Sequence, residues 1–279
     1  MGLPAMSNVT LSTGVRQNLL SLQNISAQLT TTQEALATGK KVNSALDNAT
    51  EYFTSQALDT RANSLSSLLD GISNGINTIQ TANNGITAIT KLVQSAQSIV
   101  TQAQQSSDPT TYASLATQYN NLLTQIDQLA KDSSFNGVNL LNGNSLALTL
   151  DENASTPTTL TIGATTATSS GLSLSAVTWT TASTATDFAA AATSLSSALT
   201  TLQSDSSTLS SNLQTIEVRS DFTKAMINTL QTGSGDLVNA DNNQEGANLL
   251  ALQTQQSLST TALSLAAQSD KNVLKLFGG

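Results

Sequence analysis

The sequence predicts a mainly α-helical protein: an elongated, coiled-coil-like bundle with a small β-hairpin, in which the N-terminal and C-terminal helices pair. Three observations predict this fold class. Two long segments carry apolar residues at every seventh position, a middle segment alternates apolar and polar residues between turn signals, and both chain ends carry apolar stripes. A sustained seven-residue repeat indicates a coiled-coil helix, whereas strict alternation indicates a strand.

The first long helix is predicted from a heptad series that spans roughly 63 Å at 1.5 Å per residue. A companion stripe runs beside the series and turns polar at Asn83 and Thr90. We expect the helix to end near Asp108–Pro109, because Asp caps helices and Pro suits the first helical position. The series consists of Leu58, Leu65, Ile72, Ile79, Ile86 and Val93, and Val100 continues it.

Two further helices are predicted to complete the bundle. A shorter one follows Pro109, with apolar residues from Tyr112 to Leu129 in spacings of three and four, and a short turn makes it antiparallel to the first. A second heptad series begins at Phe188 and matches the first in length. Its inner positions are Leu195, Leu202, Leu209 and Ile216. Unrelated amphipathic helices in a compact domain are the alternative, but globular helices average only about 11–12 residues.

The segment between the helices predicts a β-hairpin. Asn136–Gly137 and Asn142–Gly143 are turn signals. Leucines at 146, 148 and 150 then alternate with small or polar residues, and Leu160 and Ile162 follow a turn-rich stretch. Residues 163–187 are rich in Thr, Ser and Ala, and we expect them to form a decorated or flexible surface.

Both ends of the chain carry apolar stripes that one helix alone leaves uncovered. At the start, Leu11, Leu19 and Ile25 are expected to fill in beside the seven-residue series, and we expect either the other terminus or neighbouring copies of the chain to cover the stripes. The predicted self-assembly positions are Val15, Leu22, Leu29, Leu36, Leu258, Leu265, Val273 and Leu276.

Composition excludes several functions. The chain has no Cys and no His, which removes disulfides, Cys/His zinc sites, Cys nucleophiles and bases built on His. No nucleophile–base pair, metal cluster or phosphate loop is found, so we expect no enzyme activity, cofactor or metal. A net charge of −8 without basic clusters disfavours nucleic acid, and no apolar run is long enough to insert into a membrane.

Several motifs, in order along the chain, resemble those of bacterial flagellins. The stretch from Leu36 to Ala49 (LATGKKVNSALDNA) is similar to the family's N-terminal signature. Phe135 to Leu141 (FNGVNLL) is similar to the family's Phe-Asn-Gly-x-x-Leu-Leu turn, and Asn272 to Leu276 (NVLKL) is similar to its C-terminal ending. Each motif is weak alone, but the ordered set is specific.

The resemblance implies a structural subunit that polymerises into the flagellar filament, outside the cell, for swimming motility. It implies export in unfolded form with an uncleaved N-terminal signal, and partners among identical copies, the export apparatus, a chaperone, and hook-associated and cap proteins. A hook–filament junction protein is the alternative. We expect an inner domain (1–44 with 236–279), a helical bundle domain (45–142 with 186–235), and a hairpin and surface segment (143–185).

Some charged residues keep two interpretations. Arg61 and Arg219 lie within the heptad helices and are either solvated or paired inside the bundle, or they form contacts between subunits. Asp47 and Asn48 are expected to cap or turn the chain rather than bind a ligand. The cluster of Asp236, Asp241 and Glu245 lacks calcium-loop spacing and is expected to favour a helix start.

Overall fold

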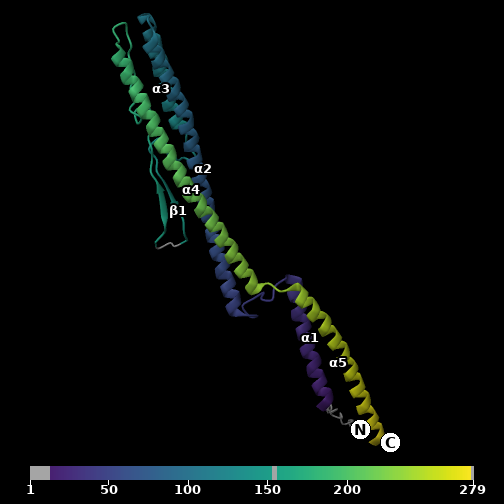
Figure 1. Cartoon of the computed structure of the whole chain (residues 1–279). Helices are drawn as coiled ribbons and strands as arrows, with labels where there is room; N and C mark the ends of the chain where they lie inside the picture. Colours follow the sequence, from purple (N-terminus) through teal and green to yellow (C-terminus); the bar gives the residue numbers. More distant parts are fainter. Residues whose placement is uncertain (1–12, 153–155, 278–279) are drawn as a thin grey trace, which may run out of the picture. The chain divides into compact units, whose positions relative to one another are not determined.

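The computed structural model describes residues 13–152 and 156–277, with side chains up to residue 272. Its elements in chain order are α1 (Thr13–Thr38), α2 (Ala49–Gln105), the short 3-10 helix η1 (Pro109–Thr111), α3 (Tyr112–Asp132), β1 (Leu146–Thr149), β2 (Thr159–Ile162), α4 (Ala185–Val238) and α5 (Asn242–Phe277) (Figure 1). The predicted fold class, mainly helical with a two-stranded antiparallel sheet, is confirmed.

Contacts divide the chain into two packed units. The terminal unit contains residues up to 59 and from 231 onward, and the central unit contains residues 60–230. The long helices α2 and α4 therefore each contribute to both units. The three-part domain division expected from the sequence stays a prediction.

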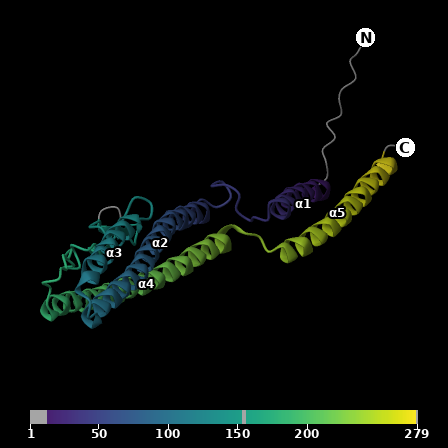
Figure 2. The ribbon, with the colours of Figure 1, turned by 90° about the horizontal axis from the view of Figure 1, so that it is seen from above.

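The central unit is a bundle of α2, α3 and α4 with the hairpin packed onto it. In Figures 1 and 2, α2 and α4 lie side by side along this unit. Within this unit the heptad positions of α2 and α4 are buried, and Ile72, Leu195 and Ile216 are fully inaccessible to solvent. Leu58, the first predicted position, is half-buried and belongs to the terminal unit.

Capping residues set the helix ends. The Asn48 side chain accepts a hydrogen bond from Glu51 N–H at 3.2 Å, so α2 begins before the first heptad position. The helix ends at Gln105, and Asp108 accepts a hydrogen bond from Thr110 N–H at 2.9 Å to start η1 and α3. The predicted break at Asp108–Pro109 is confirmed.

The predicted hairpin is confirmed as well. Leu148 pairs with Leu160, and Leu146 with Ile162, in antiparallel register. Leu148 and Ile162 face the bundle and are buried. The Asp151 side chain accepts a hydrogen bond from Thr158 N–H at 3.0 Å and holds the two strand ends together.

The segment 163–187 is packed, which corrects the expectation of a flexible surface. Leu172, Leu174 and Trp179 are each no more than 4% exposed. The Trp179 ring lies 5.6 Å from the Tyr119 ring and 5.2 Å from the Phe188 ring. The expectation failed because isolated apolar residues in a Thr/Ser-rich coil give no periodic signal, although they can still fill one face of a bundle.

Candidate self-assembly surface

The terminal unit pairs the two ends of the chain, with α1 lying along α5 (Figure 2). Val15, Ile25 and Leu29 on α1 are buried, and Leu22 and Leu36 are half-buried. On α5 the half-buried positions recur at spacings of three and four: Leu249, Leu252, Gln256, Ser259, Leu263 and Ala266. This regular spacing is that of a coiled-coil contact between the two helices.

The second row of the α1 contact differs from the one expected. Leu19 is 39% exposed, and the half-buried position beside it is Asn18, seven residues before the buried Ile25. Thr32 continues this row and is buried. Polar and apolar residues thus alternate along this row, which hydropathy alone could not show. The expected Leu11 lies outside the described residues.

A second apolar row on α5 stays exposed to solvent. Leu250, Leu258 and Leu265 are 68%, 66% and 71% exposed, and we call them the exposed leucine stripe. They recur at about two helical turns and avoid the positions that contact α1. Leu258 and Leu265 belong to the predicted set, whereas Leu250 was missed because it stands outside the seven-residue series. The side chains of the predicted Val273 and Leu276 lie outside the described residues.

Backbone hydrogen bonds tie together the two connections that flank α1 and α5. Lys40 and Asn239 form an isolated antiparallel bridge, and Lys41 N–H donates to the Val238 carbonyl at 2.8 Å. Asp241 then starts α5 by accepting a hydrogen bond from Asn243 N–H at 2.9 Å, and Glu245 lies in the first turn, as expected. These hydrogen bonds therefore hold the start of α5, the helix that carries the exposed leucine stripe, against the connection that follows α1. For Asp236 the expectation was wrong, because this residue lies in the last turn of α4.

A second anchor lies in the turn before α2. The Asp47 carboxylate accepts hydrogen bonds from Asn43 N–H at 3.0 Å and Ser44 N–H at 2.9 Å. These donors stabilise the charged form and lower the pKa of Asp47, the bond from Ser44 contributing most. Its role is the expected turn. Leu46, in the same turn, is 96% exposed and was not singled out from the sequence.

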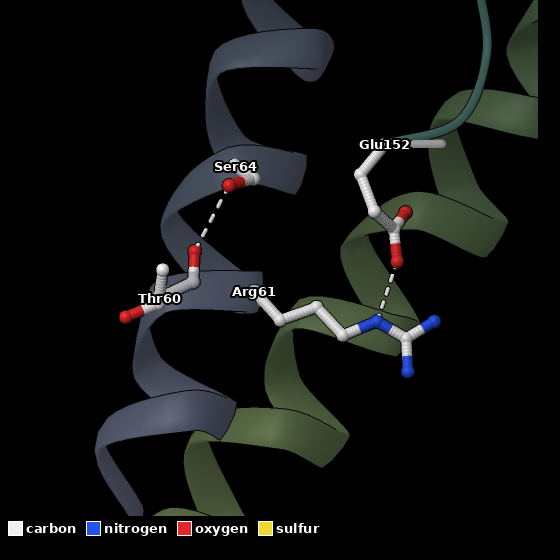
Figure 3. A network of polar contacts seen from close by, with 4 residues as sticks. All are labelled: Thr60, Arg61, Ser64 and Glu152. Carbon is white, nitrogen blue, oxygen red and sulfur yellow. Dashed lines mark hydrogen bonds and ion pairs between the residues drawn. The ribbon is translucent and has the colours of Figure 1, made fainter. Parts of the chain in front are cut away.

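The two arginines occupy different surroundings. Arg61 on α2 donates from Nε to Glu152 Oε1, beside the hydrogen bond that Ser64 Oγ makes to the Thr60 carbonyl (Figure 3). This ion pair links α2 to the turn of the hairpin, and the Arg61 side chain remains 52% exposed. Arg219 is exposed on α4, next to the exposed Val218. Val218 could not be singled out from periodicity, because it lies between heptad positions.

The described residues form no group of three or more acidic side chains that could hold a metal ion. Within the same part of the chain, no helix is long and apolar enough to cross a bilayer.

The paired terminal helices, the three-helix bundle and the hairpin define a mainly helical protein of the coiled-coil class. Comparisons with known proteins agree with this class. The family model of the bacterial flagellin N-terminal helical region matches residues 11–145, and that of the C-terminal helical region matches residues 186–277. The chain belongs to the bacterial flagellin family.

Individual relatives match over nearly their full length. Flagellin FljK of Caulobacter vibrioides is 33% identical over 277 residues, covering 98% of this chain and 99% of that protein. A flagellin of Brucella melitensis is 28% identical over 285 residues, covering 98% and 100%. Among solved structures, the crystal structure of Bacillus cereus flagellin is 20% identical with a TM-score of 0.46, covering 54% of this chain and 86% of that one.

Proposed function

We propose that this chain is a structural subunit that polymerises into the bacterial flagellar filament, outside the cell, and serves swimming motility. Membership of the flagellin family over the whole chain supports this function. The observation that carries it is the exposed leucine stripe on α5, a helix whose other face already packs on α1. The role is structural rather than enzymatic.

Energetics favour a contact between copies at this stripe. Burying a leucine side chain contributes about 1.5–3 kcal/mol, and each residue of the stripe is about two-thirds exposed in the single chain. A filament needs a contact that does not close on itself, so a surface on one copy meets a different surface on the next. A stripe repeated on every subunit provides such a contact along the polymer.

The predicted positions then take separate roles. Val15, Leu22, Leu29 and Leu36 hold α1 against α5 inside one chain, while Leu258, Leu265, Val273 and Leu276 carry the axial packing between copies. The exposed faces of the bundle set the lateral contacts, and Arg61 and Arg219 contribute there. Arg61 would contact a neighbouring copy while keeping its ion pair with Glu152, because about half of the Arg61 side chain remains accessible.

Export and capping partners belong to the same proposal. We expect the chain to leave the cell unfolded through the flagellar export apparatus, with a chaperone covering its apolar surface before secretion. The absence of Cys suits that route, because a disulfide would obstruct threading. Hook-associated and cap proteins would lie at the ends of the filament. None of the relatives reported above is a junction protein, so the filament role is the one proposed.

The test compares polymerisation of matched variants. Purified full-length protein is brought to high concentration with a precipitant salt and examined by electron microscopy. Wild type is expected to form long uniform filaments, the double variant Leu258→Ser/Leu265→Ser few or none, and Gln253→Ser, which changes an exposed polar position of the same helix, filaments like wild type. Circular dichroism of each monomer checks that the helices are intact.

Two outcomes overturn the proposal. Normal filaments from the double variant would remove the stripe from the assembly contact. Short stubs from the wild-type protein under every condition would favour the junction role instead.

A further inference from the structure

The chain contains four Asn–Gly pairs in two structural settings. Asn74–Gly75 and Asn84–Gly85 lie inside α2, whereas Asn136–Gly137 and Asn142–Gly143 lie in turns between α3 and β1. Asn followed by Gly is the pair in which the next backbone nitrogen can most easily reach the side-chain amide, since glycine has no side chain in the way. The local structure decides which of the four can react.

The helical pairs are protected. Gly75 and Gly85 are buried, and in an α-helix their N–H groups donate to the carbonyl four residues earlier. A Cβ at Gly75 would meet the Leu148 side chain and one at Gly85 would meet Leu141, so the backbone at both points is held by packed neighbours. The nitrogen of each glycine cannot turn toward the preceding side chain unless the helix opens.

The pair Asn136–Gly137 is in the opposite situation. Both residues are exposed, with φ of +48° and +80°, so they form the centre of a two-residue turn of type I′. In the described part of the chain, neither the Asn136 side chain nor the Gly137 N–H has a hydrogen-bond partner, and no atom lies within 4 Å of a Cβ built on Gly137. Among the hydrogen bonds of the described residues, the mutual backbone bonds of Phe135 and Val138, each 2.9 Å, close the turn.

The other turn pair is held more firmly. Asn142 lies in a bridge with Thr166, and the neighbouring Leu141 is fully buried and accepts a hydrogen bond from Ala167 N–H at 3.0 Å. Opening this turn displaces the fully buried Leu141, whereas the apolar residue at the Asn136 turn, Val138, packs against the core from a half-buried position.

We infer that Asn136 is a site of spontaneous deamidation in the folded protein. Hydroxide removes the proton from the Gly137 nitrogen, which attacks Asn136 Cγ and forms a new N–Cγ bond. The Cγ–Nδ2 bond then breaks, and the departing nitrogen takes a proton from water, so that ammonia leaves and hydroxide is regenerated. Water then opens the resulting succinimide ring at either carbonyl and gives aspartate or isoaspartate. No cofactor is needed, and the inference holds whether or not the chain polymerises.

The product changes the turn after α3. The new carboxylate makes the chain one unit more negative than its formal −8. Isoaspartate adds a methylene group to the backbone, so the two bonds between Phe135 and Val138 cannot both form. Asn139 still fixes the next residues, because its side chain donates to the Ala130 carbonyl at 2.8 Å and the Lys131 carbonyl at 2.9 Å.

The test follows all four pairs in the same full-length protein. Folded and urea-unfolded samples are incubated at mildly alkaline pH, digested, and analysed by mass spectrometry for amide loss at each asparagine. In the folded sample Asn136 is expected to react at close to its unfolded rate, and Asn74 and Asn84 more than about tenfold more slowly than theirs, since their reaction requires local unfolding. Asn142 is expected to fall between them.

An independent readout uses labelling by an isoaspartate-specific methyltransferase. The label should appear in aged wild-type protein and be largely lost in Asn136→Gln, while Asn74→Gln should label like wild type. Amide loss at Asn136 as slow as at Asn74 in the folded protein, or undiminished labelling of Asn136→Gln, would overturn the inference.

Discussion

Ala240 N–H donates a hydrogen bond to the Gly39 carbonyl at 2.9 Å, so the first residue after α1 is bonded to the residue two positions before α5. Gly39 has a φ of +70°, the left-handed conformation in which a helix commonly ends at glycine. The bond between the two connections therefore depends on a backbone conformation that other residues adopt only at a cost.

Substitution of Gly39 tests that cost directly. No atom lies within 4 Å of a Cβ at this position, so Gly39→Ala changes the backbone preference alone and should destabilise the terminal unit by about 1–2 kcal/mol. Gly14→Ala in α1, where the space is equally open, should stabilise the same unit by about 0.5–1 kcal/mol. Hydrogen exchange of the α1 amides measures the change in stability caused by each variant. If both variants change the stability in the same direction, the explanation is contradicted.

A second glycine pair separates packing from helix propensity in α2. A Cβ on Gly85 would contact the Ser133 side chain and lie 2.7 Å from Leu141 Cδ1, so Gly85→Ala should cost about 1–3 kcal/mol of central-unit stability. Gly71→Ala meets no atom within 4 Å and should gain about 1 kcal/mol. Urea unfolding followed by Trp179 fluorescence reports on this unit. A stabilising Gly85→Ala would show that Ser133 and Leu141 do not pack closely there.

The turn at Asp47 should weaken in acid. Hydrogen bonds from Ser44 and Asn43 lower the pKa of this carboxyl below its value in the unfolded chain. The stabilisation is therefore fully present above the unfolded pKa of about 3.9 and is lost as the pH falls through the lower folded pKa. Amide chemical shifts of Asn43 and Ser44 should follow this titration in wild type and lose it in Asp47→Asn. A titration midpoint at or above the unfolded pKa would contradict the assignment.

The aromatic cluster should contribute more to stability than its position in a Thr/Ser-rich segment suggests. Trp179 is 3% exposed and contacts the rings of Tyr119 and Phe188, so Trp179→Ala should cost about 3–5 kcal/mol. The exposed Thr181→Ala should stay within about 0.5 kcal/mol of wild type. Thermal unfolding followed by circular dichroism compares the stability of the two variants. A small loss of stability in Trp179→Ala would indicate that the segment is only loosely attached.

Sequence periodicity was a reliable guide wherever the same packing recurs along a helix. Ile72, Leu195 and Ile216 were predicted as inner positions and are fully buried, because each turn of α2 and α4 meets its neighbours in a similar way. The heptads begin at Leu58, but α2 begins nine residues earlier, where Asn48 has the expected capping role. Capping depends on a single side chain, which a repeat cannot reveal.

The candidate assembly surface was only partly predictable, for a related reason. The helix α5 has apolar residues on two faces, and the sequence does not say which face α1 covers. The structure places Leu252 and Leu263 toward the α1 contact and leaves Leu258 and Leu265 exposed. Contacts that do not repeat, such as those of Leu172 and Trp179, left no trace in hydropathy and required the three-dimensional arrangement.

Hydroxyl groups cover much of the exposed helix surface, where a more typical protein would carry charge. Thr81, Thr101 and Thr201 turn their hydroxyls back onto carbonyls four residues earlier. The ion pairs of the described residues are those of Arg61 with Glu152 and of Lys224 with Asp221. Because the described chain has so few ion pairs, screening by added salt has few electrostatic contacts to weaken. The fold is thus suited to hold its shape equally in fresh water and in brine.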